Sequence, residues 1–78
     1  MSDIQVDKEL DCRGLSCPLP VLKTKKAVGD MTSGQVLKMI CTDQGSIKDM
    51  PSWSERTGNP ILSSEENGGE FTFWIKKA

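Results

Sequence analysis

The sequence predicts a two-layer α/β sandwich with the element order β-α-β-α-β-β, in which two helices cover one face of a mixed four-stranded sheet. Three observations predict this fold. Apolar and polar residues alternate over residues 4–12 and 71–76, as in half-buried strands. Between them, residues 18–31 place apolar side chains at helical spacing ahead of a second apolar strand. The length of 78 residues suits one small domain, which we expect to span residues 1–78.

The first half of the chain predicts a βαβ unit. Its first strand covers about residues 4–12, although Lys8 interrupts the alternation of apolar and polar residues. A helix is expected from about Pro18 to Met31, followed by a strand over residues 36–41 that is buried on both faces. A strand, a crossover helix and a second buried strand make a parallel pair with a right-handed crossover.

The second half predicts a further helix and a hairpin. Pro51 interrupts the helical spacing there, so we expect one turn at 46–50 and a short helix from Pro51 to about Thr57. A short strand follows at 61–65. Asn67 and Gly68 are a strong hairpin signal, and the last strand then runs over 71–76.

Composition narrows the class of protein. The net charge of −1 argues against extensive nucleic-acid binding, which usually needs a basic excess. The first residues do not resemble a signal peptide, and no apolar run approaches the roughly 20 residues of a membrane span. Three cysteines form no evident disulfide framework. We therefore expect a cytoplasmic protein with free thiols and no membrane association.

The absence of histidine limits the chemistry further. It removes Cys–His and Ser–His dyads and zinc sites of the mixed Cys/His type. Three cysteines are one short of a closed four-cysteine site. We expect no metal and no cofactor. Reactive chemistry in this chain must work without an imidazole base, and thiol–sulfur exchange meets that condition because nucleophile and leaving group are both thiolates.

Cys17 is the residue best placed for such chemistry. It follows the first predicted strand and precedes Pro18, which is favoured at the first position of a helix. Cys17 would then be the N-cap, among free backbone N–H groups at the positive end of the helix dipole. A helix terminus contributes about 0.3–1 kcal/mol, up to ~2 in favourable geometry. One pKa unit is ~1.36 kcal/mol, so we expect a moderately activated thiol.

Three nearby residues support this arrangement. Gly14 can take the positive φ that a tight loop requires. Pro20 is tolerated because it lies in the first turn, before intrahelical N–H bonds are needed. Arg13 would add to the activation of the thiol if its side chain folded back toward Cys17.

The run from Leu10 to Pro20 resembles the signature of the TusA/SirA-like sulfur carriers, a strand, a "D…GL.CP.P" turn and a helix. The resemblance covers essentially the whole chain. It continues through the lysine-rich helix, Ser33-Gly34, Asp43, Asp49-Met50-Pro51, the hairpin and Lys76-Lys77.

The resemblance implies the same β-α-β-α-β-β fold and a sulfurtransferase activity. The family cysteine, here Cys17, accepts sulfane sulfur as a persulfide and passes it to a cysteine of a partner protein. The implied partners are a donor, such as a cysteine desulfurase or a rhodanese-like enzyme, and an acceptor relay protein. The implied pathways are tRNA thiolation, cofactor synthesis and sulfur oxidation. We expect a monomer that makes no direct contact with nucleic acid.

Several alternatives remain open from the sequence. Cys12 is either a core residue at a strand end or a second thiol that closes a disulfide with Cys17. Cys41 follows a buried strand pattern and is expected in the core. Lys23 and Lys26 form either a solvated helix face or a docking site for acidic partners. At the level of function, the alternatives are a thiol redox switch and a non-catalytic regulatory or nucleic-acid-binding module.

Overall fold

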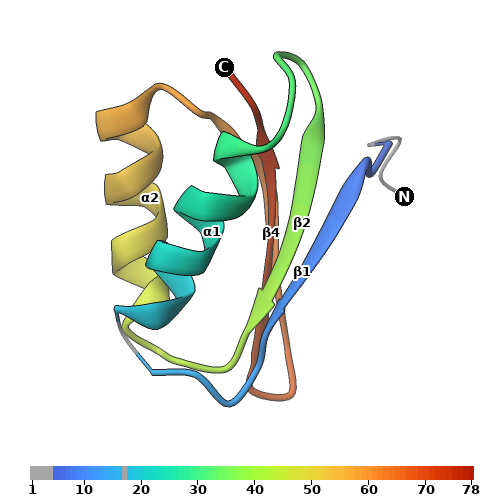
Figure 1. The fold of residues 1–78 in the computed structure, drawn as a ribbon. Helices are drawn as coiled ribbons and strands as arrows, with labels where there is room; N and C mark the ends of the chain where they lie inside the picture. Colours follow the sequence, from blue (N-terminus) through green and yellow to red (C-terminus); the bar gives the residue numbers. More distant parts are fainter. Residues whose placement is uncertain (1–4, 17) are drawn as a thin grey trace.

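The computed structural model describes residues 5–16 and 18–78. Its elements follow the predicted order: β1 (Lys8–Cys12), α1 (Leu19–Gly29), β2 (Val36–Cys41), α2 (Ser46–Thr57), β3 (Ile61–Asn67) and β4 (Glu70–Lys76). The strands lie side by side as β1-β2-β4-β3, with β1 parallel to β2 and the other neighbours antiparallel. Both helices cover the same face of the sheet (Figure 1). The predicted mixed sheet with helices on one face is confirmed.

The core lies between the helices and the sheet. On β4, Phe71, Phe73 and Ile75 are buried, whereas the alternate residues Thr72 and Trp74 stay half-exposed on the face without helices, which we call the open face. The buried core cluster comprises Cys12, Ala27, Val28, Met31, Leu37, Met39, Cys41, Met50, Trp53, Phe71, Phe73 and Ile75. The alternation of the last strand therefore predicted its buried side correctly.

The first strand is shorter than expected. Residues 1–4 lie outside the described residues, and β1 begins only at Lys8. Before it, the backbone N–H of Asp7 donates to the carbonyl of Val36 at 2.9 Å, and the Asp7 carboxylate accepts from the Val36 N–H at 2.8 Å. The Asp7 carboxylate thus binds the Val36 N–H, which would pair with the β1 backbone if that strand were longer. Val6, just before it, is exposed.

The first helix ends two residues earlier than expected. It stops at Gly29, and Asp30 is its C-cap, with the Asp30 N–H bonded to carbonyls of the last turn. Met31 is buried just beyond this end, which explains why its apolar side chain extended the helical pattern. Inside the helix, the buried Thr24 hydroxyl donates to the carbonyl of Pro20 at 2.7 Å. The predicted position of this helix is therefore correct, but its predicted end at Met31 is two residues too far along the chain.

The second helix runs unbroken from Ser46 to Thr57 with Pro51 inside it, so the expected division at Pro51 is wrong. A proline in a helix leaves the carbonyl four residues earlier without its usual N–H donor. Here that carbonyl belongs to Ile47, a residue on the exposed side of the helix. Packing of Met50 and Trp53 in the core then holds the helix together across the proline.

The hairpin is where the sequence placed it, and β3 extends two residues beyond the expected 61–65. Gly68 and Gly69 take φ angles of 59° and 86°, and Asn67 pairs with Glu70 across the turn. Two consecutive positive φ angles match the twist of the flanking strands, which is why such hairpins favour glycine. Among the described residues, no helix has the length and apolar character needed to span a bilayer.

Candidate functional site

The carboxyl ends of the parallel strands β1 and β2 meet at one edge of the sheet, and both helices begin there (Figure 1). In α/β sheets this edge is the usual place for a functional site. The two loops that follow the strands are joined directly, because the Gly14 N–H donates to the Thr42 hydroxyl at 3.0 Å. The β1–α1 loop, residues 13–18, is therefore tied to the neighbouring loop.

The start of this loop is a tight turn. The Leu15 N–H donates to the Cys12 carbonyl at 3.2 Å, and Gly14 has a φ of 82°. A positive φ at the third position of such a turn is the type II pattern. A Cβ at Gly14 would meet nothing within 4 Å. The backbone angle, and not lack of space, therefore requires glycine, as the sequence predicted.

The helix begins one residue later than expected. Pro18 is the N-cap, with φ −97° and ψ 12°, and the first helical residue is Leu19. The Leu19 N–H donates to the Ser16 carbonyl at 2.9 Å, and the Leu22 N–H donates to the Pro18 carbonyl at 3.1 Å. The expectation that Pro18 opens the helix as its first residue is therefore wrong, and with it the N-cap position assigned to Cys17. Cys17 itself lies outside the described residues.

This start leaves few free backbone N–H donors at the beginning of α1. Pro18 and Pro20 have no N–H, and the Leu19 N–H is already bonded to Ser16. The aligned peptide dipoles still place about half a positive charge at this end of α1. Pro20 is fully buried, so the second proline contributes to the core as well as to the first turn.

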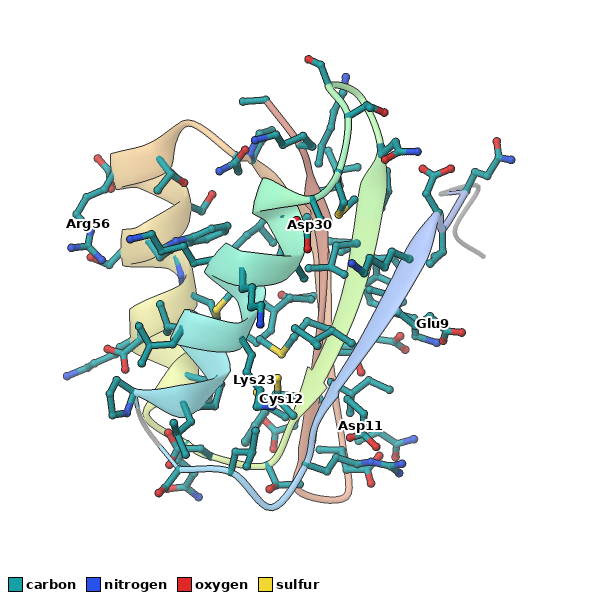
Figure 2. The ribbon with its side chains drawn as sticks, in the orientation of Figure 1. Glu9, Asp11, Cys12, Lys23, Asp30 and Arg56 are labelled. Atoms are coloured by element: carbon teal, nitrogen blue, oxygen red, sulfur yellow. The ribbon has the colours of Figure 1, made fainter. Side chains whose placement is uncertain are left out.

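Arg13 is held by two carboxylates. Its Nε and Nη2 donate to the two carboxylate oxygens of Asp11 at 3.0 Å each, and Nη1 lies 3.5 Å from Glu70 Oε2. The Arg13 backbone N–H also donates to Asp11. These bonds lower the pKa of Asp11 to about 2 and raise the pKa of Arg13. Asp11 lies on the side of β1 away from the helices (Figure 2), so its carboxylate neutralises the charge of Arg13 on that side. The activation of Cys17 by Arg13 stays a prediction.

Cys12 and Cys41 are unreactive by position. They face each other in register on β1 and β2, both are free, and neither side chain is exposed. Burial raises the pKa of both thiols, and the mutual repulsion of their charged forms raises that of Cys12 further. The Ser46 hydroxyl and the Asp43 N–H lower the pKa of Cys41, but burial outweighs them. The core placement of both residues is confirmed, and a buried protonated thiol is a poor nucleophile.

The lysines of α1 divide between two surfaces. Lys23 and Lys26 line a groove of about 210 Å³ between α1 and β1, whereas Lys25 lies outside it. Lys8 of β1 lines the same groove, and sequence reasoning missed this. The signal was present, because Lys8 occupies a helix-facing position of the strand and breaks its apolar alternation. Lys23 lies close to Cys12 in Figure 2, and its charge partly offsets the raised pKa of that thiol.

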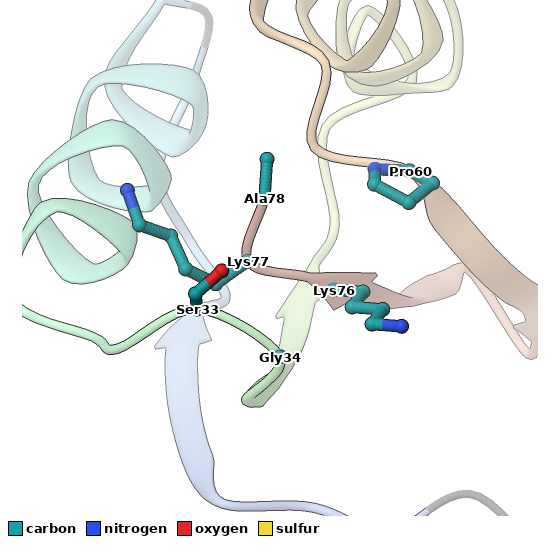
Figure 3. Close-up of a pocket in the computed structure, with 6 residues that line it drawn as sticks. All are labelled: Ser33, Gly34, Pro60, Lys76, Lys77 and Ala78. Carbon is teal, nitrogen blue, oxygen red and sulfur yellow. The ribbon is translucent and has the colours of Figure 1, made fainter.

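A second hollow has a volume of about 410 Å³ (Figure 3). It lies at the end of the sheet where the chain terminates (Figure 1), and its lining consists of Ser33, Gly34, Pro60, Lys76, Lys77 and Ala78. The Gly34 N–H donates to the Lys77 carbonyl at 2.8 Å, so two of the lining residues are joined through the backbone. This hollow takes no part in the site at the β1–α1 loop.

Comparison with known proteins agrees with the loop and the fold. The family model described as sulfurtransferase TusA matches residues 8–77. The chain belongs to the TusA sulfurtransferase family. Sulfur carrier protein TusA of Allochromatium vinosum is 53% identical over 72 residues, which cover 92% of this chain and 95% of that protein. Sulfur carrier protein TusA of Pseudomonas entomophila is 38% identical over 77 residues, covering 99% and 96%.

A solved structure shows the same fold as this TusA family member. The SirA-like protein from Desulfitobacterium hafniense matches with a TM-score of 0.78 and covers 88% of this chain and 95% of its own. Its sequence identity is 24%, so it supports the fold alone. The family and its named members together support a role in carrying sulfur, in which other proteins of a sulfur relay are the partners.

Proposed function

We propose that this TusA family member is a sulfur carrier in which Cys17 accepts sulfane sulfur as a persulfide and relays it to a cysteine of a partner protein. The observation that supports Cys17 over the other two cysteines is the burial of Cys12 and Cys41, both with raised pKa values. The β1–α1 loop, by contrast, has exposed residues on both sides of Cys17, namely Ser16 and Pro18.

The transfer step needs no imidazole. The Cys17 thiolate attacks the outer sulfur of a donor persulfide, a new S–S bond forms, and the donor S–S bond breaks. The donor leaves as a thiolate, and Cys17 holds the persulfide, so no net oxidation occurs. In the second half, a partner thiolate attacks the outer sulfur on Cys17 and the Cys17 thiolate leaves. The α1 dipole favours the thiolate as nucleophile and as leaving group.

The residues around Cys17 would act by positioning. Gly14 supplies the positive φ that turns the chain after β1, and its N–H bond to Thr42 holds the loop against its neighbour. Pro18 and Pro20 fix the first turn of α1 by limiting backbone freedom. Arg13 clamps the strand end through Asp11 and Glu70. None of these residues needs to touch the transferred sulfur.

The partners would be a persulfide-bearing donor, such as a cysteine desulfurase or a rhodanese-like enzyme, and an acceptor protein of a sulfur relay. Both must approach the β1–α1 loop. Lys23 and Lys26 are exposed on α1, the helix that follows this loop, and would attract acidic partner surfaces. The carrier would act as a monomer in a reducing compartment, since the chemistry requires a free thiol.

The redox-switch alternative has less support. It requires Cys12 to reach Cys17, and the Cys12 side chain is fully buried with Cys41 as its cross-strand neighbour. The raised pKa of Cys12 also makes it a slow nucleophile. The nucleic-acid-binding alternative could use the lysines that line the groove beside α1, but the net charge of −1 disfavours it.

Mass spectrometry tests the proposal. The protein is incubated with inorganic polysulfide, freed of excess reagent and analysed by peptide mapping. We expect one added sulfur on the peptide with Cys17, loss of that addition in Cys17→Ser, and its retention in Cys12→Ala and Cys41→Ala. Sulfur on Cys12 or Cys41 in the native protein, or persistent relay by Cys17→Ser to an acceptor, would contradict the assignment.

A further inference from the structure

A groove runs between α1 and the free edge of β1. Its floor is apolar and consists of the half-buried Leu10 and the buried Ala27. Lys23 and Lys26 border it on the helix side and Lys8 on the strand side, and Asp30 lies at one end. Figure 2 shows Lys23 and Asp30 toward opposite ends of α1, with Lys23 nearer the β1–α1 loop. The groove therefore leads toward the candidate sulfur site.

The charges on the two sides of β1 are matched differently. On the open face, Asp11 is paired with Arg13, and Glu9 lies 4.0 Å from the Lys38 ammonium. On the helix side, Lys8, Lys23 and Lys26 make no ion pair within residues 5–16 and 18–78. The groove lining holds these three lysines and one acidic residue, Asp30, so its net charge is positive and favours an anionic occupant.

A protective role explains only part of this pattern. Lysine on an edge strand is a common means of preventing strand-to-strand aggregation, and Lys8 fits that role. It does not explain why two lysines of α1 converge on the same groove over an apolar floor, in a protein whose net charge is −1. The convergence points to a binding surface.

We infer that this groove docks an extended acidic segment of the protein that exchanges sulfur with the carrier, with one apolar side chain of the segment on Leu10 and Ala27. The inference rests on the proposed function for the identity of the partner, though not for the binding itself. β1 is one of the two edge strands of the sheet, so an extended segment beside it would direct alternate side chains under α1. Asp30 disfavours acidic residues at its end and so places them toward the β1–α1 loop.

A titration with a model peptide tests the groove without any sulfur chemistry. The full-length protein, labelled with ¹⁵N, is titrated with a blocked peptide of four glutamates around a central leucine. The expected result is chemical-shift change at the amides of Lys8, Leu10 and Ala27. Exchange of both Lys8 and Lys23 for glutamine should weaken binding about fivefold or more. The matched control is Lys25→Gln, an exposed lysine of the same helix outside the groove, which should bind as the wild type does.

The outcomes separate this inference from the proposed function. Three results would each overturn the inference that this groove docks an acidic segment. They are equal affinity of the double variant and the wild type, chemical-shift changes confined to another surface, and equal binding of a peptide with glutamine in place of glutamate. A protein whose Cys17 fails to load sulfur but which binds the peptide would overturn the proposed function and leave the groove intact. The glutamine exchanges are on exposed side chains, and an unchanged thermal midpoint confirms that both variants are folded.

Discussion

Cys12 and Cys41 lie directly opposite each other on the parallel strands β1 and β2, and both thiols are completely buried. The carrier therefore has two of its three cysteines in the core, directly beneath the loop that leads to the third. Burial raises the pKa of both thiols, and under the proposed function this leaves Cys17 as the reactive position. A protein that transfers sulfur between thiolates benefits from having a single reactive position.

The buried pair predicts a loss of stability at alkaline pH. The folded pKa values of Cys12 and Cys41 are raised, so the unfolded chain releases these protons first. Their stabilising contribution is complete below the unfolded pKa of about 8.5 and is lost as the pH rises from there toward the folded values. Urea unfolding of the wild type should show a steeper fall between pH 8 and 10 than that of the Cys12→Ala, Cys41→Ala double variant. Parallel slopes would mean that other groups dominate.

The clamp on Arg13 predicts an unusually acidic carboxyl group. Asp11 should titrate at a pKa of about 2 by ¹³C NMR, because Arg13 stabilises its charged form. A lowered pKa contributes stability above the unfolded value, and that contribution is lost as the pH falls through the folded value. In Arg13→Gln the midpoint should return toward about 3.9. An ordinary midpoint in the wild type would show that the pair does not persist in solution.

Gly14→Ala tests the turn of the β1–α1 loop. The φ of 82° forces alanine into the left-handed region, at a cost of about 1–2 kcal/mol in the free energy of unfolding. Because the turn leads to Cys17, persulfide loading should also slow. The control is Gly29→Ala in α1, where a Cβ meets nothing and helix propensity predicts a gain of up to about 1 kcal/mol. Similar effects of the two substitutions on persulfide loading would show that the turn at Gly14 is not needed to position Cys17.

Charge reversal on α1 tests docking during transfer. The Lys23→Glu, Lys26→Glu variant should pass sulfur to an acidic acceptor more slowly at low salt, and the difference should shrink as ionic strength rises. Alkylation of Cys17 by a neutral reagent should change much less. Lys76→Glu, exposed at the opposite end of the sheet, serves as the charge control. Equal transfer rates of the wild type and the variant at every salt concentration would show that these lysines only form a solvated helix face.

Sequence by itself determined the order of elements, the alternation in β4, the need for glycine at position 14 and the core position of Cys41, whereas it left Cys12 open between the core and a second thiol. These features depend on residues close together in the chain, where periodicity and backbone preference decide the outcome. The same local preferences predicted Cys17 as the N-cap of α1. That prediction was wrong by one residue, because the Leu19 N–H donates to the Ser16 carbonyl and Pro18 is the N-cap.

Tertiary structure alone decided the features that join distant segments. Arg13 meets Glu70 only because the hairpin before β4 lies at the same end of the sheet as the β1–α1 loop. Lys8 meets Lys23 and Lys26 only because α1 packs over the edge of β1. α2 continues through Pro51 because Met50 and Trp53 are packed in a core built by the whole sheet. In each case the deciding energy comes from contacts between segments far apart in the chain, which local patterns do not encode.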